Sequence, residues 1–276
     1  MKVLLIKENG RHDANRKYGE CFALQSCFVK LGHECEIWGL GHENFESQPD
    51  WESYDWIINL ENYDQTGWIP SLSNVKKSKK FLWSIDAHCR GEAVFEHTFR
   101  EGNYDVLLHA TKDYVKQDYH LWFPNAVHDE LIKPMNLEKE YDFGFCGNYV
   151  NRKPVLEFLE REHNLHLDIF VIGDAMVEAI NKYRCHFNLN IANDINFRSF
   201  ETIGCGTLLL TNYNPQYEEL GFIDGENCFM YTDHNSLIEK INYIKNNDTS
   251  EIAKNGYELS TKNTYLDRVK MLLETA

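Results

Sequence analysis

The sequence contains no long apolar run: no stretch approaches the roughly 18 residues that a membrane-spanning helix needs. The first ten residues, MKVLLIKENG, become polar too early for the apolar region of a secretory signal peptide. We therefore expect a soluble, cytoplasmic chain that has no membrane partner.

Basic residues are also scarce, with 28 Lys and Arg against 43 Asp and Glu, for a formal net charge of −15. The deficit is even along the chain, because residues 1–140 carry 16 bases and 23 acids and the remainder carries 12 bases and 20 acids. An acidic surface repels phosphate backbones at long range. The charge therefore argues against nucleic acid as a general partner, although a local basic groove stays open.

None of the eight cysteines forms a CxxC pair. Cys35 and Cys146 lie inside apolar runs, which favours buried, reduced thiols over metal ligands or disulfides. The composition, 43% hydrophobic and 26% charged, is that of an ordinary globular protein. At about 150 residues per domain, 276 residues predict two domains.

The N-terminal half has the pattern of a Rossmann-like unit. The apolar run at residues 3–6 is typical of a parallel strand that is buried on both faces. Cys21, Leu24 and Phe28 then recur at helical spacing. Strands that alternate with helices form a parallel sheet with right-handed crossovers. The strands predicted here are residues 3–6, 34–38, 56–60, 81–85 and 106–110.

A linker is expected at residues 124–140, which contain two prolines, many charges and little periodicity. A second α/β series follows it, and ligands of such folds bind at the carboxyl ends of the strands. We therefore predict two Rossmann-like domains, residues 1–130 and 141–262, that face a central cleft. The predicted strands of the second series are residues 143–146, 167–172, 187–189, 207–211 and 228–231, and its helices are 154–163, 175–183, 197–205, 235–246 and 264–274.

The most informative stretch is DINFRSFETIGCGTLLLTNY, residues 194–213. Asp194 or Asn196 can cap a helix that begins at Phe197. Arg198 and Glu201 are three residues apart, so they share one face near the helix N-terminus, where free N–H groups and the helix dipole favour a diphosphate. Arg198 can add charge-assisted bonds, and Glu201 can accept bonds from two ribose hydroxyls. An ordinary ion pair on a solvated helix face is the open alternative.

A glycine turn, FCGNYVNRKPVLEFL, follows the first strand of the second half. Gly147 permits close approach of a ligand, while Asn148, Arg152 and Lys153 supply donors and positive charge. Gly173 ends another strand at the same expected edge, where a nucleobase can lie against backbone amides. A plain strand–helix loop is the alternative for this turn.

Together these pieces resemble the nucleotide-sugar-binding half of GT-B glycosyltransferases, especially the spore-maturation-type group. The matching pieces are the glycine turn, HFNLNIANDINFRSFETIGCGTLLLTNY, YTDHNSL, and IAKNG followed by NTYLDR, over roughly residues 141–270. The resemblance implies that Glu201 binds the donor ribose and that basic residues, Arg198 among them, bind the diphosphate. It also implies that the last helix, in residues 263–276, packs back on the N-terminal domain.

A more distant likeness is to the phage DNA β-glucosyltransferases, carried by the stretch KKSKKFLWSIDAHCRG and the R-x-x-E helix. It implies that Asp86 is the catalytic base. Asp86 closes a predicted strand, so it is also expected at the carboxyl edge, where a base must reach the acceptor hydroxyl. A cap for the next helix is the alternative role. Further candidates at predicted strand ends are Glu61, Asp64 and His88.

Two basic segments flank these elements. Arg11 and His12 lie in the polar loop after the first strand and are candidates, with His88, for contact with the acceptor; a solvated loop is the alternative. The lysine-rich run at residues 76–80 precedes a strand, so we expect it to be a solubilising surface away from the site. No D-x-D motif is present. We expect no metal ion, because a helix N-terminus with arginines can stabilise the leaving diphosphate.

The sequence thus predicts a metal-independent, inverting glycosyltransferase that uses a nucleoside-diphosphate sugar, most simply a UDP-sugar. The acceptor stays open between a hydroxymethylated base of phage DNA, a carbohydrate, a small molecule and a protein. The alternatives are a UDP-sugar epimerase or hydrolase on the same fold, with Asp64, His88 and His128 as candidate residues, and a non-catalytic nucleotide-sugar-binding protein.

Overall fold

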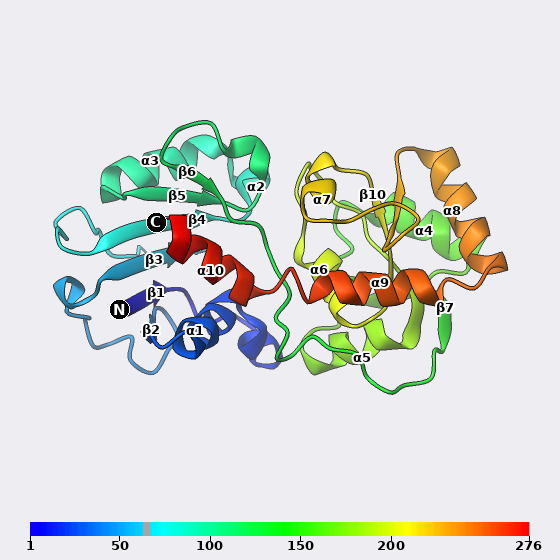
Figure 1. Ribbon diagram of the computed structural model, residues 1–276, viewed down its shortest axis with the longest axis horizontal. Coiled ribbons are helices and arrows are strands. Elements are labelled where there is room, and N and C mark those ends of the chain that lie inside the picture. Colours follow the sequence, from blue (N-terminus) through cyan, green and yellow to red (C-terminus); the bar gives the residue numbers. More distant parts are fainter. Residues whose placement is uncertain (63–66, 276) are drawn as a thin grey trace. The chain divides into compact units, whose positions relative to one another are not determined.

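The computed structural model describes residues 1–62 and 67–275. The chain forms two compact units (Figure 1). Unit 1 comprises Met1–Pro124 and the C-terminal segment from Tyr265, and unit 2 comprises Asn125–Thr264. The segment expected to be a linker is irregular, but from Asn125 onward it belongs to unit 2, where Asn125 Nδ2 donates to Ile195 O (3.1 Å) and Ile132 is buried.

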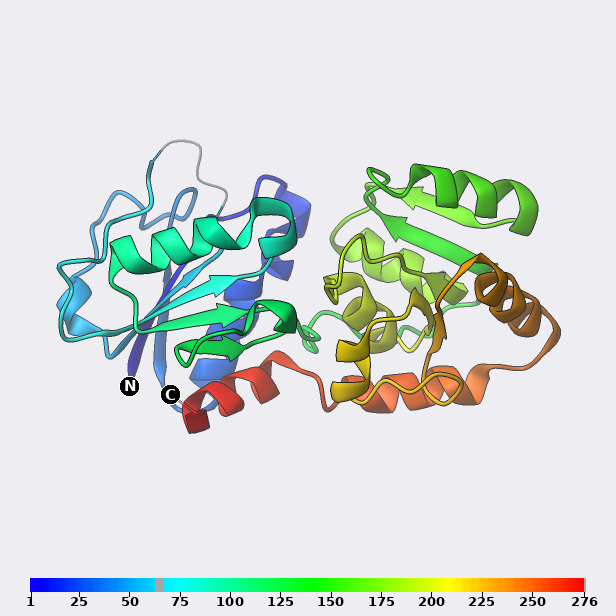
Figure 2. The same ribbon diagram turned by 90° about the horizontal axis from the view of Figure 1, so that it is seen from above.

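Unit 1 contains a six-stranded parallel sheet in the order β2-β1-β3-β4-β5-β6. Helix α3 covers one face, and α1, with α10 packed against it, covers the other (Figure 2). The inner strands β1, β3, β4 and β5 are buried on both faces, which is why they read as nearly continuous apolar runs, whereas the edge strand β2 alternates exposed and buried residues. The elements are β1 (Lys2–Ile6), η1 (Asp13–Tyr18), α1 (Glu20–Lys30), β2 (Glu34–Trp38), η2 (Trp51–Ser53), β3 (Trp56–Leu60), β4 (Lys79–Ser84), α2 (Ala87–Arg90), α3 (Glu92–Gly102), β5 (Val106–His109), η3 (Lys112–Tyr114), β6 (His120–Trp122) and α10 (Tyr265–Thr275).

Unit 2 contains a five-stranded parallel sheet in the order β11-β10-β9-β7-β8. Its core is apolar and is built from alternate residues of the strands and from α4 and α8. The elements are β7 (Tyr141–Gly147), α4 (Lys153–His163), β8 (His166–Ile169), α5 (Asp174–Lys182), β9 (Tyr183–Phe187), α6 (Phe197–Gly204), β10 (Leu208–Asn212), α7 (Pro215–Glu219), β11 (Phe229–Tyr231), α8 (His234–Asn246) and α9 (Ser250–Ser260).

Two strand predictions differ from the structure. The strand expected at 187–189 is β9, which begins at Tyr183 directly after α5. Tyr183, Cys185 and Phe187 are fully buried and alternate with polar residues, which is the period-two pattern of a strand, and the prediction began four residues too late. Strand β6 was not predicted, because three residues leave no periodicity to recognise. The sequence analysis also missed helices α7 and α9.

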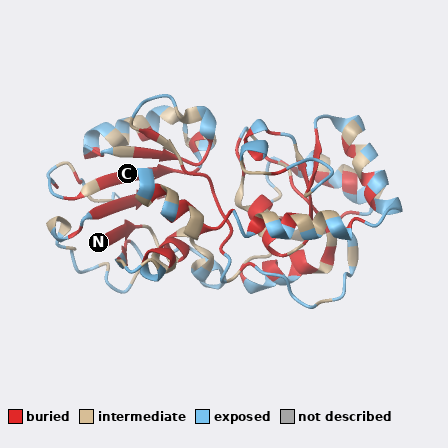
Figure 3. Cartoon of the chain, viewed as in Figure 1, coloured by how far each residue is buried: buried red, intermediate tan, exposed pale blue. Residues whose placement is uncertain are grey.

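The burial of the residues (Figure 3) corrects the prediction for the lysine-rich run and refines the prediction for the cysteines. Lys80, from the lysine run that we expected to be solvated, is only 3% exposed, and its Nζ donates to the carbonyl oxygens of Leu72 and Gly102. Burial lowers the pKa of this ammonium group. The cysteines are reduced, as predicted, and seven are buried, whereas Cys89 in α2 is exposed. Across the residues described, no helix is both long and apolar enough to cross a bilayer.

Candidate functional site

The candidate site of unit 2 is built around the start of α6, at the carboxyl edge of the sheet. This helix begins at Phe197, as predicted, after Asn196 in an extended conformation. Asn196 makes no side-chain cap bond; its Nδ2 donates to Asn188 Oδ1 (3.1 Å) instead. Asn196 Oδ1 is buried and has no hydrogen-bond partner among the described residues. The first turn of α6 therefore keeps N–H groups that no side chain caps.

Arg198 is fixed by two neutral acceptors. Its Nε donates to Cys146 O and its Nη1 to Asn188 Oδ1, both at 2.8 Å, and the guanidinium lies 4.9 Å above the ring of Phe145. Within residues 1–62 and 67–275, no carboxylate forms an ion pair with it. Burial and the nearby charge of Arg152 lower the pKa of Arg198 to about 10. The half-buried positive charge is thus not neutralised by any carboxylate of the described residues.

Gly147 makes room for this guanidinium. The residue has φ +146°, and a Cβ at this position would lie 2.3 Å from Arg198 Nη2. A side chain would therefore displace Arg198. Arg152 is buried behind the same turn, where its Nε donates to Leu189 O (2.8 Å). Two cationic side chains so close together favour the binding of an anion at this turn.

Glu201 lies one turn further along α6 and is half-buried. Its carboxylate accepts no hydrogen bond from any residue that the structure describes. Burial raises the pKa of Glu201, and the Arg198 charge offsets this only in part. No Arg198–Glu201 ion pair forms, so the alternative of a solvated i, i+3 pair is wrong. A desolvated carboxylate without donors is typical of a site that binds a ligand with hydroxyl groups.

Asn188 is a buried residue that holds Arg198 and Asn196 in place. The sequence analysis did not single it out. Its Oδ1 accepts from both Arg198 and Asn196, and its Nδ2 donates to Ser199 Oγ (3.0 Å). Asn188 is completely buried, as is Tyr217, whose hydroxyl is hydrogen-bonded to Ser199 (2.6 Å). Both polar atoms of the Asn188 side chain are thus hydrogen-bonded, and a buried amide held in this way is rigid. The only signal in the sequence is the run of asparagines in FNLNIAND.

His186 joins the glycine turn to α6 and was also not singled out. Cys146 N donates to His186 Nε2 (3.0 Å), so Nδ1 carries the proton and donates to Thr202 Oγ1 (2.7 Å). The Thr202 hydroxyl donates in turn to the Arg198 carbonyl (2.6 Å). Burial lowers the pKa of His186 well below its usual value, so the ring stays neutral at neutral pH. Both backbone polar groups of Cys146 are therefore hydrogen-bonded, the carbonyl to Arg198 and the N–H to His186.

The other residues of unit 2 that were predicted for the site form no hydrogen bond with Arg198 or Glu201. Asn148 is exposed, and its Oδ1 accepts from Val150 N (2.8 Å), which shapes the turn. Gly173 has φ +67° and precedes α5, but it does not end a strand as predicted, because β8 already ends at Ile169, and no hydrogen bond joins it to Arg198. His128 is buried in unit 2. The structure thus brings together Gly147, Arg152, Asn196, Arg198 and Glu201.

Asp86 lies at the carboxyl edge of the unit 1 sheet, just beyond β4. It precedes α2, yet its side chain makes no cap bond, so the capping alternative does not describe its carboxylate. The side chain is exposed and accepts no hydrogen bond within the described part of the chain. Its backbone N–H donates to Glu61 Oε2 (2.7 Å). The backbone is therefore fixed, while the carboxylate stays available.

The other candidates of unit 1 differ from Asp86. Glu61 is buried and already accepts backbone hydrogen bonds, so it is not an accessible base. His88 is half-buried, and its Nδ1 lacks a partner in the described structure. Arg11 and His12 are exposed ahead of η1. Asp64 lies outside the described residues.

We predict that Glu201→Gln stabilises the protein at neutral pH but not in acid. A carboxyl whose pKa is raised by folding binds more protons in the folded state, so its contribution to stability decreases as the pH rises above ~4.3. Glutamine does not titrate, and the melting temperature should rise by about 2–4 °C at pH 8, the shift expected for about 1 kcal/mol.

Thermal unfolding at pH 4 and pH 8 checks this prediction. The exposed Glu226→Gln is the control and should leave the melting temperature unchanged at both pH values. Destabilisation of the Glu201 variant at pH 8 would show that unit 2 itself supplies donors to this carboxylate.

Comparison with known proteins identifies the family of the chain and solved structures with a similar fold. The family model described as "Glycosyl transferase-like" matches residues 128–274, which is more than half of the chain. A search of the curated proteins gives no match. Among solved structures, an alpha-glucosyltransferase in complex with UDP-glucose and DNA containing an abasic site has a TM-score of 0.69 at 13% identity, over 100% of this chain and 99% of that one.

Two further solved structures are similar. The DNA-modifying enzyme beta-glucosyltransferase has a TM-score of 0.66 at 14% identity, with 98% of this chain and 96% of that chain covered. Anabaena Alr3699/HepE in complex with UDP and glucose has a TM-score of 0.65 at 12% identity, with 100% and 99% covered. These likenesses extend over both units and identify the fold as GT-B, as the sequence predicted. The chain therefore belongs to the glycosyl transferase-like family.

Proposed function

We propose that this glycosyltransferase uses a UDP-sugar as its donor and binds it at the start of α6. The observation that carries the proposal is the pairing, one helical turn apart, of an Arg198 guanidinium and a Glu201 carboxylate: among the described residues the first has no carboxylate partner and the second no hydrogen-bond donor. The first charge suits a diphosphate and the second suits a pair of ribose hydroxyls. Similar solved structures that contain UDP or UDP-glucose support this assignment.

Each group of the donor has a proposed partner. The diphosphate binds the uncapped N–H groups of α6, Arg198 Nη2 and Arg152, while the Gly147–Asn148 turn allows it to approach the backbone. The ribose hydroxyls donate to Glu201, and the base lies toward Gly173. These positive groups stabilise the charge of the leaving diphosphate without a metal ion.

In the proposed reaction, Asp86 is the general base and the sugar is inverted. The acceptor O–H bond breaks, and its proton passes to a carboxylate oxygen of Asp86. The acceptor oxygen forms a bond to the anomeric carbon. The bond from that carbon to the phosphate oxygen breaks, and its electron pair leaves with UDP. The exposed Asp86 carboxylate, which accepts no hydrogen bond in the described structure, supports this role.

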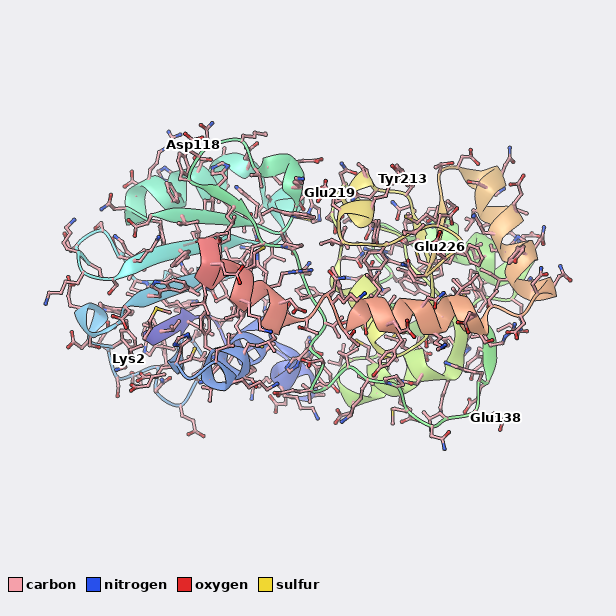
Figure 4. The ribbon with its side chains drawn as sticks, viewed as in Figure 1. Lys2, Asp118, Glu138, Tyr213, Glu219 and Glu226 are labelled. Atoms are coloured by element: carbon pink, nitrogen blue, oxygen red, sulfur yellow. The ribbon has the colours of Figure 1, made fainter. Side chains whose placement is uncertain are left out.

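For the acceptor, we propose a hydroxymethylated base of DNA. Solved structures of two similar enzymes support it, since one contains DNA and the other is named as a DNA-modifying enzyme. The surface charge opposes it: acidic side chains of unit 2 such as Glu138, Glu219 and Glu226, which are labelled in Figure 4, are exposed. Binding would therefore depend on a local contact and should weaken steeply with salt.

Replacing Arg198 with Met should lower the affinity for UDP by about 10- to 100-fold, because charge-assisted hydrogen bonds contribute about 1.5–3 kcal/mol. Titration calorimetry with UDP measures this. Arg161→Met is the control, since Arg161 is exposed in α4 and contacts Glu162. Unchanged UDP affinity in the Arg198 variant, with its fold intact, would contradict the donor assignment.

Replacing Asp86 with Asn should lower the rate of UDP release from UDP-glucose by at least about 100-fold, with water as acceptor, and leave the UDP affinity unchanged. The exposed Asp118→Asn is the matched control in unit 1. In the wild type, NMR should detect β-glucose first, because water attacks the α-linked donor with inversion. Wild-type turnover of the Asp86 variant would refute its role, and initial α-glucose would refute inversion.

Adding duplex DNA that contains hydroxymethylated cytosine should accelerate UDP release at low ionic strength, and the acceleration should disappear as salt is added. An unmodified duplex of identical sequence is the control and should have no effect. If the modified duplex has no effect at low salt, DNA is not the acceptor, and carbohydrates and small hydroxylated molecules become the compounds to test.

A further inference from the structure

A buried carboxylate lies directly behind Asp86. Glu61 follows β3 and is only 6% exposed. Its Oε2 accepts two consecutive backbone N–H groups, from Ile85 (2.6 Å) and Asp86 (2.7 Å). Its Oε1 pairs with Arg90 Nε (2.6 Å). Both oxygens of one side chain are therefore used to fix the segment that carries Asp86.

Glu61 accepts these two N–H groups just beyond the last residue pair of the β3–β4 ladder. The last β3–β4 register pair is Leu60–Trp83, so Ile85 and Asp86 lie beyond this ladder. Asp86 has φ −110° and ψ 42°, which turns the chain away from the strand direction. Without Glu61, the two amide groups would lose their acceptor at a largely buried position.

Arg90 connects the other end of the same segment. Besides Glu61, its guanidinium contacts Asn62, where Nη1 donates to the carbonyl oxygen (2.7 Å). Helix α2 has only four residues, too few to be stable by itself. The end of β3 thus fixes α2 through Arg90 and the preceding amides through Glu61, with Asp86 between these two attachments.

Glu61 must be ionised to pair with Arg90 and accept both amide hydrogens. Burial raises its pKa, as does the charge of Asp86, while the Asp86 amide, Arg90 and the Ile85 amide lower it. The amides and Arg90 offset burial and the Asp86 charge only in part, so the pKa of Glu61 is raised on balance. The Glu61 oxygens are directed at the backbone and at Arg90, so they do not compete for an acceptor proton.

We propose that Glu61 is a positioning residue for Asp86. Glu61 fixes the backbone at Asp86 and so holds the Asp86 carboxylate at the carboxyl edge of β4. The proposal rests on the proposed function, in which Asp86 is the base. Glu61 then acts on the chemical step alone, because the donor residues belong to unit 2. Loss of this positioning lowers kcat and leaves donor binding unchanged.

The chain offers a matched control in the same unit. Glu52 also accepts two consecutive backbone N–H groups with its carboxylate, from Lys76 and Lys77 (both 2.9 Å). These amides precede β4, at the opposite end of the strand from Asp86. Glu52→Gln therefore makes the same chemical change to the same kind of contact, remote from the proposed base.

The experiment compares Glu61→Gln, Glu52→Gln and Asp86→Asn. Glutamine has one acceptor oxygen where Glu61 uses two, so it cannot serve both amides and Arg90. We expect kcat for UDP release from UDP-glucose to fall about 10- to 100-fold in Glu61→Gln, with the UDP dissociation constant within about twofold of wild type. Amide exchange at residues 85 and 86 should accelerate. Glu52→Gln should keep the wild-type kcat.

Two outcomes would overturn the proposal: a wild-type kcat in Glu61→Gln, or a loss of kcat accompanied by a matching loss of UDP binding. If Glu61→Gln does not fold, Glu61→Asp retains the charge with a shorter reach, and an unchanged kcat in that variant also overturns it. Failure of the proposed function has a different signature, because Asp86→Asn would then release UDP at the wild-type rate.

Discussion

The unneutralised charge of Arg198 is the interaction on which the candidate donor site depends. Its two acceptors are neutral, a carbonyl of β7 and the Asn188 side chain, so they fix the guanidinium without cancelling its charge. A carboxylate partner would stabilise the folded chain but would occupy the place of an anionic ligand. The glycine at position 147, the buried asparagine and the neutral His186 all serve this one arrangement.

At the carboxyl edge of the sheet in each unit, a buried polar side chain fixes a group that lies nearer the surface. In unit 2 the buried Asn188 fixes Arg198, and in unit 1 the buried Glu61 fixes the backbone of Asp86. In each case the supporting side chain has its polar groups satisfied by the protein, while the group nearer the surface keeps bonding capacity for a ligand. Such sites lower the stability of the folded state in exchange for binding.

Local signals made much of this predictable. Asn196 before the helix and Gly204 near its end predicted α6 to within one residue, and helical spacing then put Arg198 and Glu201 on one face. The predictions that failed concern residues whose contacts join segments far apart in the sequence. Glu61 is a strand-end carboxylate in the sequence, but its role follows from its contact with amides 24 and 25 residues away. Lys80 is likewise buried because two remote carbonyls accept from it.

The exposed Cys89 has a practical consequence. It is the one exposed thiol among eight, and it lies in α2, three residues after Asp86. Thiolate reactivity depends on access to solvent, so a maleimide dye should label this cysteine ahead of the buried seven. A fluorophore there would report the local environment of Asp86, the proposed base, without any engineered residue.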